Sequence, residues 1–209
     1  MTSSPPSCRF ITNKMCPFAQ KAWIALEAAG AKYNLEQVSL YGPGGKPDWF
    51  WKLNPKGQVP VLVVEDEDLV LADSDLILDE IQRVVDAKRS KLYDVMSNDD
   101  VNATQKVQSF RNCLSEFLPI GKKAVLGGNN DKMWTKLQEL DALIQTPYVA
   151  GEQLTVADCA GFPFLWRIQQ EYGNVWEEHG CNNIPQWLEQ CSRQPAFAKS
   201  IQSSWWWWW

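Results

Sequence analysis

The sequence is poor in the residues that build metal sites and dithiol centres. It has one histidine, His179, and none of its six cysteines belongs to a Cys-x-x-Cys pair, which argues against a bound metal. It lacks the run of about 18 apolar residues that a membrane span requires, so we expect no stable membrane insertion. A basic patch is also missing and the formal net charge is −5, which argues against nucleic acid or an anionic membrane as the main partner.

The polar, proline-rich start has no apolar segment of the signal-peptide kind, which favours a cytoplasmic location with reduced thiols. The cysteines are Cys8, Cys16, Cys113, Cys159, Cys181 and Cys191. What the chain does have is an apolar share of 45% over 209 residues, enough for one large or two small domains.

Cys16 lies where a β-like run (residues 9–12) gives way to an amphipathic helical run (residues 20–29), and Pro17 suits the first helical position, so we expect the helix to begin at about residue 17. A sulfur at such a junction is close to unpaired N–H groups and to the positive end of the helix dipole. We therefore expect the pKa of Cys16 to fall below the usual ~8.5, with a small buried hydrophobe as the alternative interpretation. Ala19 occupies the place of the second cysteine of a Cys-x-x-Cys motif. A catalyst with one thiolate needs a second thiol from outside, and glutathione is the obvious candidate.

The first part of the chain predicts the order β-α-β-(α)-β-β-α of a thioredoxin-like α/β domain, at residues 1–85. Within it, Gly30 is expected to cap the first helix in a left-handed conformation, and Asp73 or Ser74 to cap the last one. The charged residues 86–97 predict a linker.

The following residues, 98–204, predict an all-helical domain, with helices near residues 101–125, 132–144, 156–172 and 185–191. Thr155 and Asp158 have the spacing of a capping box. The five tryptophans at residues 205–209 have no folding rationale and are left out of the fold prediction, with an aromatic flap over a functional site as the alternative.

Four segments, in order and at the right spacing, resemble the cysteine-type glutathione transferases of the omega and lambda classes and the dehydroascorbate reductases. Residues 16–24 (Cys-Pro-Phe-Ala-Gln-Lys-Ala-Trp-Ile) are similar to the active-site helix of the omega and lambda classes. Residues 46–50 (Lys-Pro-Asp-Trp-Phe) resemble a segment of omega transferases and plant dehydroascorbate reductases. Residues 54–60 are similar to the family's cis-proline segment, and residues 72–75 (Ala-Asp-Ser-Asp) are especially similar to dehydroascorbate reductases.

The resemblance implies a thioredoxin-like domain followed by a helical bundle domain, with glutathione as co-substrate and no tightly bound cofactor. It implies that Cys16 is catalytic and that glutathione is bound by Phe18, Lys46, Val59, Pro60, Asp73 and Ser74. The backbone of Val59, before a cis Pro60, would pair with the extended tripeptide. Ser74 and the helix N-terminus would hold the γ-glutamyl carboxylate, Asp73 the ammonium group, and Lys46 the glycyl carboxylate.

Each of these residues also has a purely structural interpretation. Val59-Pro60 can be an ordinary trans bond, and Asp73 and Ser74 can be plain helix caps. Phe18 can be an aromatic residue packed on the first helix, and Lys46 a solvated surface lysine. The residues expected to line a second-substrate pocket can equally be core: Phe110, Phe117, Phe162 and Trp166.

The resemblance implies glutathione-dependent thiol transfer or dehydroascorbate reduction, in which Cys16 forms a mixed disulfide with glutathione. The short residues 12–15 place Met15 directly before Cys16, where dehydroascorbate reductases have a longer loop with an acidic end, so the subclass stays open between omega, lambda and dehydroascorbate reductase. A non-enzymatic binding module and a chloride-intracellular-channel-like protein remain alternatives. The oligomeric state is either a monomer or a homodimer.

Overall fold

The computed structural model describes residues 8–40, 45–85, 90–94, 100–128 and 130–201, and these residues form two compact units. The first unit contains the described residues up to Lys91 together with Ser200 and Ile201, and the second runs from Leu92 to Lys199. The division falls inside the predicted linker, residues 86–97, although part of that segment lies outside the described residues. The tryptophan tail, residues 205–209, also lies outside them.

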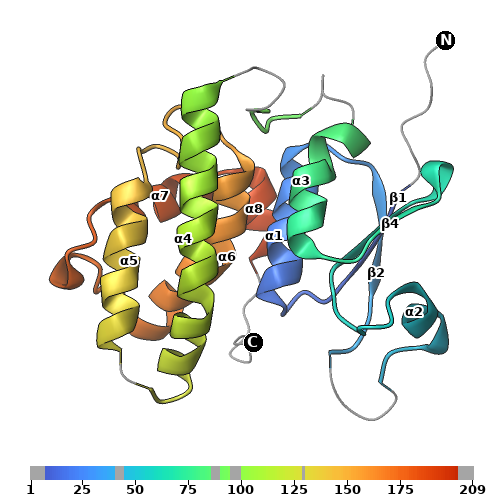
Figure 1. The fold of residues 1–209 in the computed structure, drawn as a ribbon, viewed down its shortest axis with the longest axis horizontal. Coiled ribbons are helices and arrows are strands. Elements are labelled where there is room, and N and C mark those ends of the chain that lie inside the picture. The colour runs from blue at the N-terminus through green and yellow to red at the C-terminus, as the bar shows by residue number, and fades with distance from the viewer. Residues whose placement is uncertain (1–7, 41–44, 86–89, 95–99, 129, 202–209) are drawn as a thin grey trace. The chain divides into compact units, whose positions relative to one another are not determined.

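The first unit is built on a four-stranded mixed sheet, as the sequence predicts (Figure 1). Its strands are ordered β2-β1-β3-β4, with β1 parallel to β2 and antiparallel to β3, and β3 antiparallel to β4. Helices α1 and α3 pack together on one face, and α2 lies on the other side of the sheet. The elements are β1 (Cys8–Thr12), α1 (Pro17–Ala28), β2 (Tyr33–Gln37), α2 (Asp48–Leu53), β3 (Val61–Val64), β4 (Leu69–Leu71) and α3 (Ser74–Val84).

Helix α1 begins and ends as its sequence predicts. Cys16 is the N-cap residue in an extended conformation, and Pro17 occupies the first helical position. Gly30 has φ +67°, which confirms the left-handed cap. The N–H of Gly30 donates to Glu27 O (3.1 Å) and that of Ala31 to Leu26 O (2.9 Å), the two bonds of a Schellman motif.

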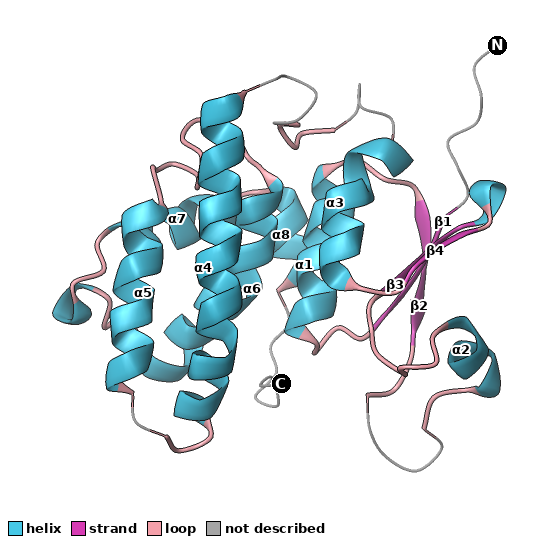
Figure 2. Cartoon of the chain, in the orientation of Figure 1, coloured by secondary structure: helices cyan, strands magenta, loops and turns pink. Residues whose placement is uncertain are grey.

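The second unit is helical (Figure 2), and two of its four predicted helices have the expected bounds. None of the described helices has the length and the apolar character needed to cross a membrane. The short last helix was not predicted, because six residues with Phe197 as their one large apolar side chain show no periodicity. The helices are α4 (Val101–Val125), α5 (Asp131–Leu143), α6 (Val156–Tyr172), α7 (Asn183–Ser192) and α8 (Pro195–Ser200), of which α8 belongs to the second unit up to Lys199.

Asp158 confirms the predicted capping box of α6 and has a wider structural role. Its fully buried carboxylate accepts hydrogen bonds from the N–H of Thr155 (2.8 Å) and from its hydroxyl (3.0 Å). It also accepts from the N–H of Val149 and from the indole N–H of Trp187, both at 2.8 Å. Burial raises the pKa of Asp158, while these donors act in the opposite direction. One carboxylate therefore joins the start of α6, the preceding loop and α7.

Replacing this carboxylate should weaken the helical unit strongly. Asp158→Ala should lower the free energy of unfolding by about 3–5 kcal/mol, because three buried N–H donors lose their acceptor. Asp158→Asn keeps the shape and one acceptor oxygen, so we expect it to lose less than half as much. Urea denaturation followed by circular dichroism measures both, and a loss below about 1 kcal/mol for the alanine variant would contradict this role.

Candidate functional site

Cys16 lies at the N-terminus of α1, immediately after a tight turn that follows β1. The turn is held by Asn13, whose Oδ1 accepts from the N–H of Met15 (3.0 Å) and whose Nδ2 donates to Val38 O (2.9 Å). The N–H of Cys16 donates to Asn13 O at 3.0 Å. Sequence reasoning did not single out Asn13, although asparagine after a strand is a known turn signal. The turn and the helix together fix the direction of the thiol.

The Sγ of Cys16 lies 4.0 Å from the carbonyl oxygen of Val59. The Val59-Pro60 bond is cis, which confirms the bond geometry that the family resemblance implies. Asn54 organises the loop before it, because its side chain donates to Gln58 O (2.8 Å) and accepts from the N–H of Lys56 (3.1 Å). The thiol therefore faces the end of a loop that is fixed by its own hydrogen bonds.

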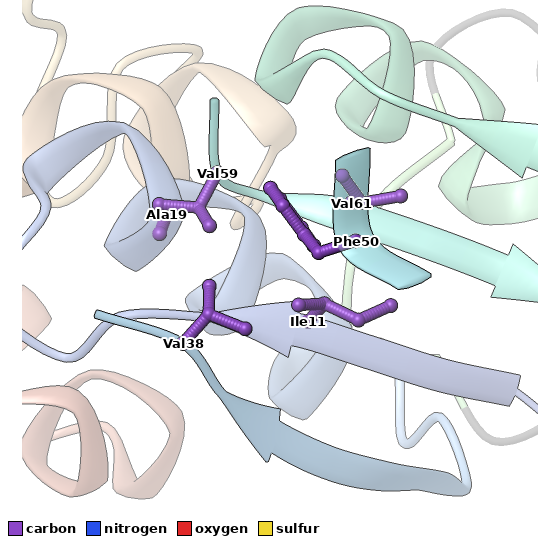
Figure 3. Packing of buried hydrophobic residues seen from close by; sticks show 6 residues of the cluster. All are labelled: Ile11, Ala19, Val38, Phe50, Val59 and Val61. Atoms are coloured by element: carbon purple, nitrogen blue, oxygen red, sulfur yellow. The ribbon is translucent and has the colours of Figure 1, made fainter. Parts of the chain in front are cut away.

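Cys16 packs against a set of buried apolar residues that we term the apolar cluster. Figure 3 shows Ala19 and Val59 beside each other in this cluster. Ala19 is fully buried, so the position of a second motif cysteine is filled by a methyl group in a close-packed environment. The cluster consists of Ile11, Ala19, Val38, Phe50, Val59 and Val61.

Burial separates Cys16 from the other cysteines. All six cysteines lie within the described residues and are present as thiols; Cys16 is half-buried and the other five are buried. Burial raises the pKa of each of these five thiols, in the case of Cys181 to about 12. A raised pKa keeps them in the unreactive thiol form at neutral pH. Cys16 is therefore the one thiol of the six that is partly exposed.

The Asp73-Ser74 pair lies at the N-terminus of α3, as the sequence predicts. The Oδ1 of Asp73 accepts from the N–H groups of Asp75 (2.8 Å) and Leu76 (3.1 Å), so Asp73 is the N-cap residue. Ser74 is buried at the first helical position, and the cap does not use its N–H. The capping interpretation of Asp73 is thus confirmed, and it is compatible with a ligand at Ser74.

Lys46 and Phe18 both lie in the first unit and are half-buried. The Nζ of Lys46 donates to Leu40 O at 3.1 Å, across a loop whose residues 41–44 lie outside the described part of the chain. Phe18 lies on the first turn of α1, with the Nζ of Lys21 5.8 Å from its ring centroid. Neither position tests a role in ligand binding.

Three of the four residues expected at a second-substrate pocket are core residues instead. Phe110, Phe117 and Phe162 are fully buried within the helical unit. The ring centroid of Phe162 lies 4.9 Å from that of Phe197, and the ring of Phe110 lies beside Trp187. Only Trp166 is partly exposed, with the guanidinium of Arg167 over its ring. Apolar periodicity alone could not separate a pocket wall from a core.

Two family models match the chain. One describes the N-terminal domain of glutathione S-transferases and matches residues 15–84, and the other describes the C-terminal domain and matches residues 119–195. Cys16, Lys46, Val59, Pro60 and Ser74 all fall within the first match.

Known proteins with the same overall extent include plant and animal relatives. The probable glutathione S-transferase DHAR1 of Oryza sativa, described as cytosolic, is 26% identical over 88% of this chain and 83% of its own length. The glutathione S-transferase omega-1 of Sus scrofa is 25% identical over 94% of this chain and 83% of its own length.

Solved structures share the fold. The omega glutathione transferase 1C of Trametes versicolor has a TM-score of 0.79 and 22% identity, covering 95% of this chain and 92% of its own. The rice transferase GST1, solved in complex with glutathione, has a TM-score of 0.78 and 19% identity, covering 96% and 92%.

The loop before the cis-proline offers a test of how this site is built. Gly57 has φ +63°, and a Cβ there would lie 2.4 Å from a ring atom of Trp51. Gly57→Ala should therefore strain the backbone and displace the indole, lowering the free energy of unfolding by about 2 kcal/mol. Gly45 is the matched control, since it has φ +44° with no atom within 4 Å of a Cβ.

Gly45→Ala should carry only the backbone cost, of about 1 kcal/mol. Equal losses in the two variants, measured by chemical denaturation, would show that the ring of Trp51 does not constrain the loop.

Proposed function

This chain belongs to the glutathione S-transferase family, and we propose that it is a cysteine-type member that catalyses glutathione-dependent thiol transfer and dehydroascorbate reduction. The observation that carries the proposal is the half-buried Cys16 at the helix N-terminus, 4.0 Å from the Val59 carbonyl, in a chain whose other cysteines are all buried. The sequence similarity to DHAR1 and to an omega transferase supports it.

Glutathione would lie along the loop that ends at Val59, with its thiol at Cys16. The N–H and C=O of Val59 would pair with the cysteinyl part of the tripeptide, and cis Pro60 would turn that backbone outward. Ser74 would receive the γ-glutamyl carboxylate at the N-terminus of α3, and Asp73 the ammonium group. Lys46 would pair with the glycyl carboxylate, and Phe18 would flank the sulfur.

With a mixed disulfide as substrate, the Cys16 thiolate attacks the sulfur of the glutathionyl half. A Cys16–glutathione disulfide forms, and the original thiol leaves as a thiolate. A second glutathione thiolate then attacks the glutathionyl sulfur, which releases glutathione disulfide and restores the Cys16 thiolate. Ala19 has no thiol that could resolve this disulfide, so the resolving thiol comes from glutathione.

With dehydroascorbate as substrate, the thiolate first adds to a carbonyl carbon, and the oxygen takes up a proton. A glutathione thiolate then attacks the Cys16 sulfur, so that the carbon–sulfur bond breaks and its electron pair leaves with ascorbate. The resulting disulfide is resolved as before. The balance is one dehydroascorbate and two glutathione molecules consumed, with one ascorbate and one glutathione disulfide formed.

The same chemistry fits a cytoplasmic location, where reduced glutathione is the main thiol buffer. Trp166 is the one residue of the expected second-substrate set that keeps an exposed surface for such a role. Monomer and homodimer are both compatible with this proposal.

Substitution of Cys16 tests the proposed function. Cys16→Ser should lower dehydroascorbate and disulfide turnover by at least about a hundredfold, because a serine hydroxyl is not ionised near neutrality and forms no disulfide. The variant should show weak conjugation of a chloro-aromatic electrophile, since its hydroxyl can donate to the glutathione thiolate. Parallel assays with the three substrates measure both effects.

Cys113→Ser is the control, because it removes a buried thiol in the other unit and should keep turnover within about twofold. Reductase rates that do not change in Cys16→Ser would sink the proposal. Glutathione binding without turnover of any of the three substrates by the wild-type protein would favour the binding-module alternative.

A further inference from the structure

Lys21 is a lysine buried inside the glutathione-binding unit. Only 3% of its side chain is exposed, and its Nζ lies 2.8 Å from Oδ1 of Asp75. Burial of an ammonium group is costly unless it is paired and hydrogen-bonded. Lysine side chains usually keep their ammonium groups in water, so a lysine that is almost fully buried requires a reason.

The ion pair joins the two elements that carry the proposed site. Lys21 lies on α1, five residues after Cys16, and Asp75 is the second residue of α3, directly after Ser74. Its Nζ also lies 5.8 Å from the ring centroid of Phe18, on the turn of α1 that follows the thiol. The ammonium group therefore links the helix that positions the thiol to the helix end that would receive a carboxylate.

The charges at the start of α3 explain why a cation is needed there. Ser74 lies between two exposed carboxylates, Asp73 and Asp75. The helix dipole favours an anion at this end by about 0.3–1 kcal/mol, and neighbouring negative charges oppose it. Asp73 would be compensated by the ammonium group of the ligand, whereas Asp75 needs a positive charge from the protein.

We propose that Lys21 is a positioning residue that offsets the charge of Asp75 in the first turn of α3, so that Ser74 and the helix N-terminus can bind the γ-glutamyl carboxylate of glutathione. The inference rests on the proposed function and extends it to a residue that does not itself touch the ligand. Its effect falls on the affinity for glutathione, because Lys21 changes how well a carboxylate is held and takes no part in sulfur transfer.

The test measures binding and turnover in charge variants. Lys21→Met should raise the glutathione Kd from titration calorimetry and the glutathione KM about tenfold, with kcat at saturating glutathione within about twofold. Lys21→Arg should restore most of the affinity, because it keeps the charge. Lys32→Met, which removes an exposed positive charge from the same unit, should leave Kd and KM within about twofold.

A double variant separates charge compensation from packing. If Lys21 acts by offsetting Asp75, the Lys21→Met/Asp75→Asn protein should recover most of the lost affinity, because both charges are then absent. Loss of packing alone would not be repaired by the second substitution. A double variant no better than Lys21→Met, or a Lys21→Met protein with wild-type Kd and KM, would overturn the inference.

Two further experiments complete the test. Should Lys21→Met fail to fold, as seen by circular dichroism, Asp75→Asn carries the test, since removal of that carboxylate should leave glutathione binding as strong or stronger. Weaker binding in Asp75→Asn would overturn the inference.

The wild-type protein is titrated with glutathione before any variant. Absence of glutathione binding refutes the proposed function and this inference together, whereas wild-type binding with unchanged Lys21→Met affinity refutes the inference alone.

Discussion

The packing of α1 against the sheet is the constraint on which the rest of the site depends. Most of its side chains are buried, and Ala19 packs in one cluster with Ile11 of β1 and Val61 of β3. The indole N–H of Trp23 donates to the hydroxyl of Tyr33 at 2.7 Å, and this hydroxyl in turn donates to Glu27. A helix held on several sides gives its N-terminal residue little freedom to move, so the thiol keeps its distance from the opposite loop.

Local signals predicted the elements that position the site. Pro17 at the start of α1 and Gly30 beyond its end act through local backbone geometry, which does not depend on tertiary packing. Two short apolar runs on either side of the acidic residues 65–68 likewise predicted the hairpin of β3 and β4. The capping residue Asp73 was predictable for the same reason, because a cap satisfies N–H groups only two and three residues away.

What sequence reasoning missed depends on contacts between distant segments. The salt bridge of Lys21 joins residues 54 positions apart, and nothing near Lys21 in the sequence indicates that it is buried. The phenylalanines Phe110, Phe117 and Phe162 show the opposite error. Their spacing identified an apolar helix face, but whether such a face lines a pocket or meets another helix is decided by tertiary packing. Asn13 combines a local and a distant contact. Its turn could be predicted from nearby residues, whereas its hydrogen bond to Val38 O could not.

The buried methyl group of Ala19 has a consequence for the cell. In an enzyme with two active-site cysteines, the second cysteine resolves the mixed disulfide formed by the first. The rate of this release is set by the structure of the enzyme itself. Under the proposed function, the lifetime of the covalent Cys16 adduct would be set by the concentration of reduced glutathione around the protein. When that pool is depleted, the adduct would persist, and the occupancy of this single sulfur would become a record of the redox state of its surroundings.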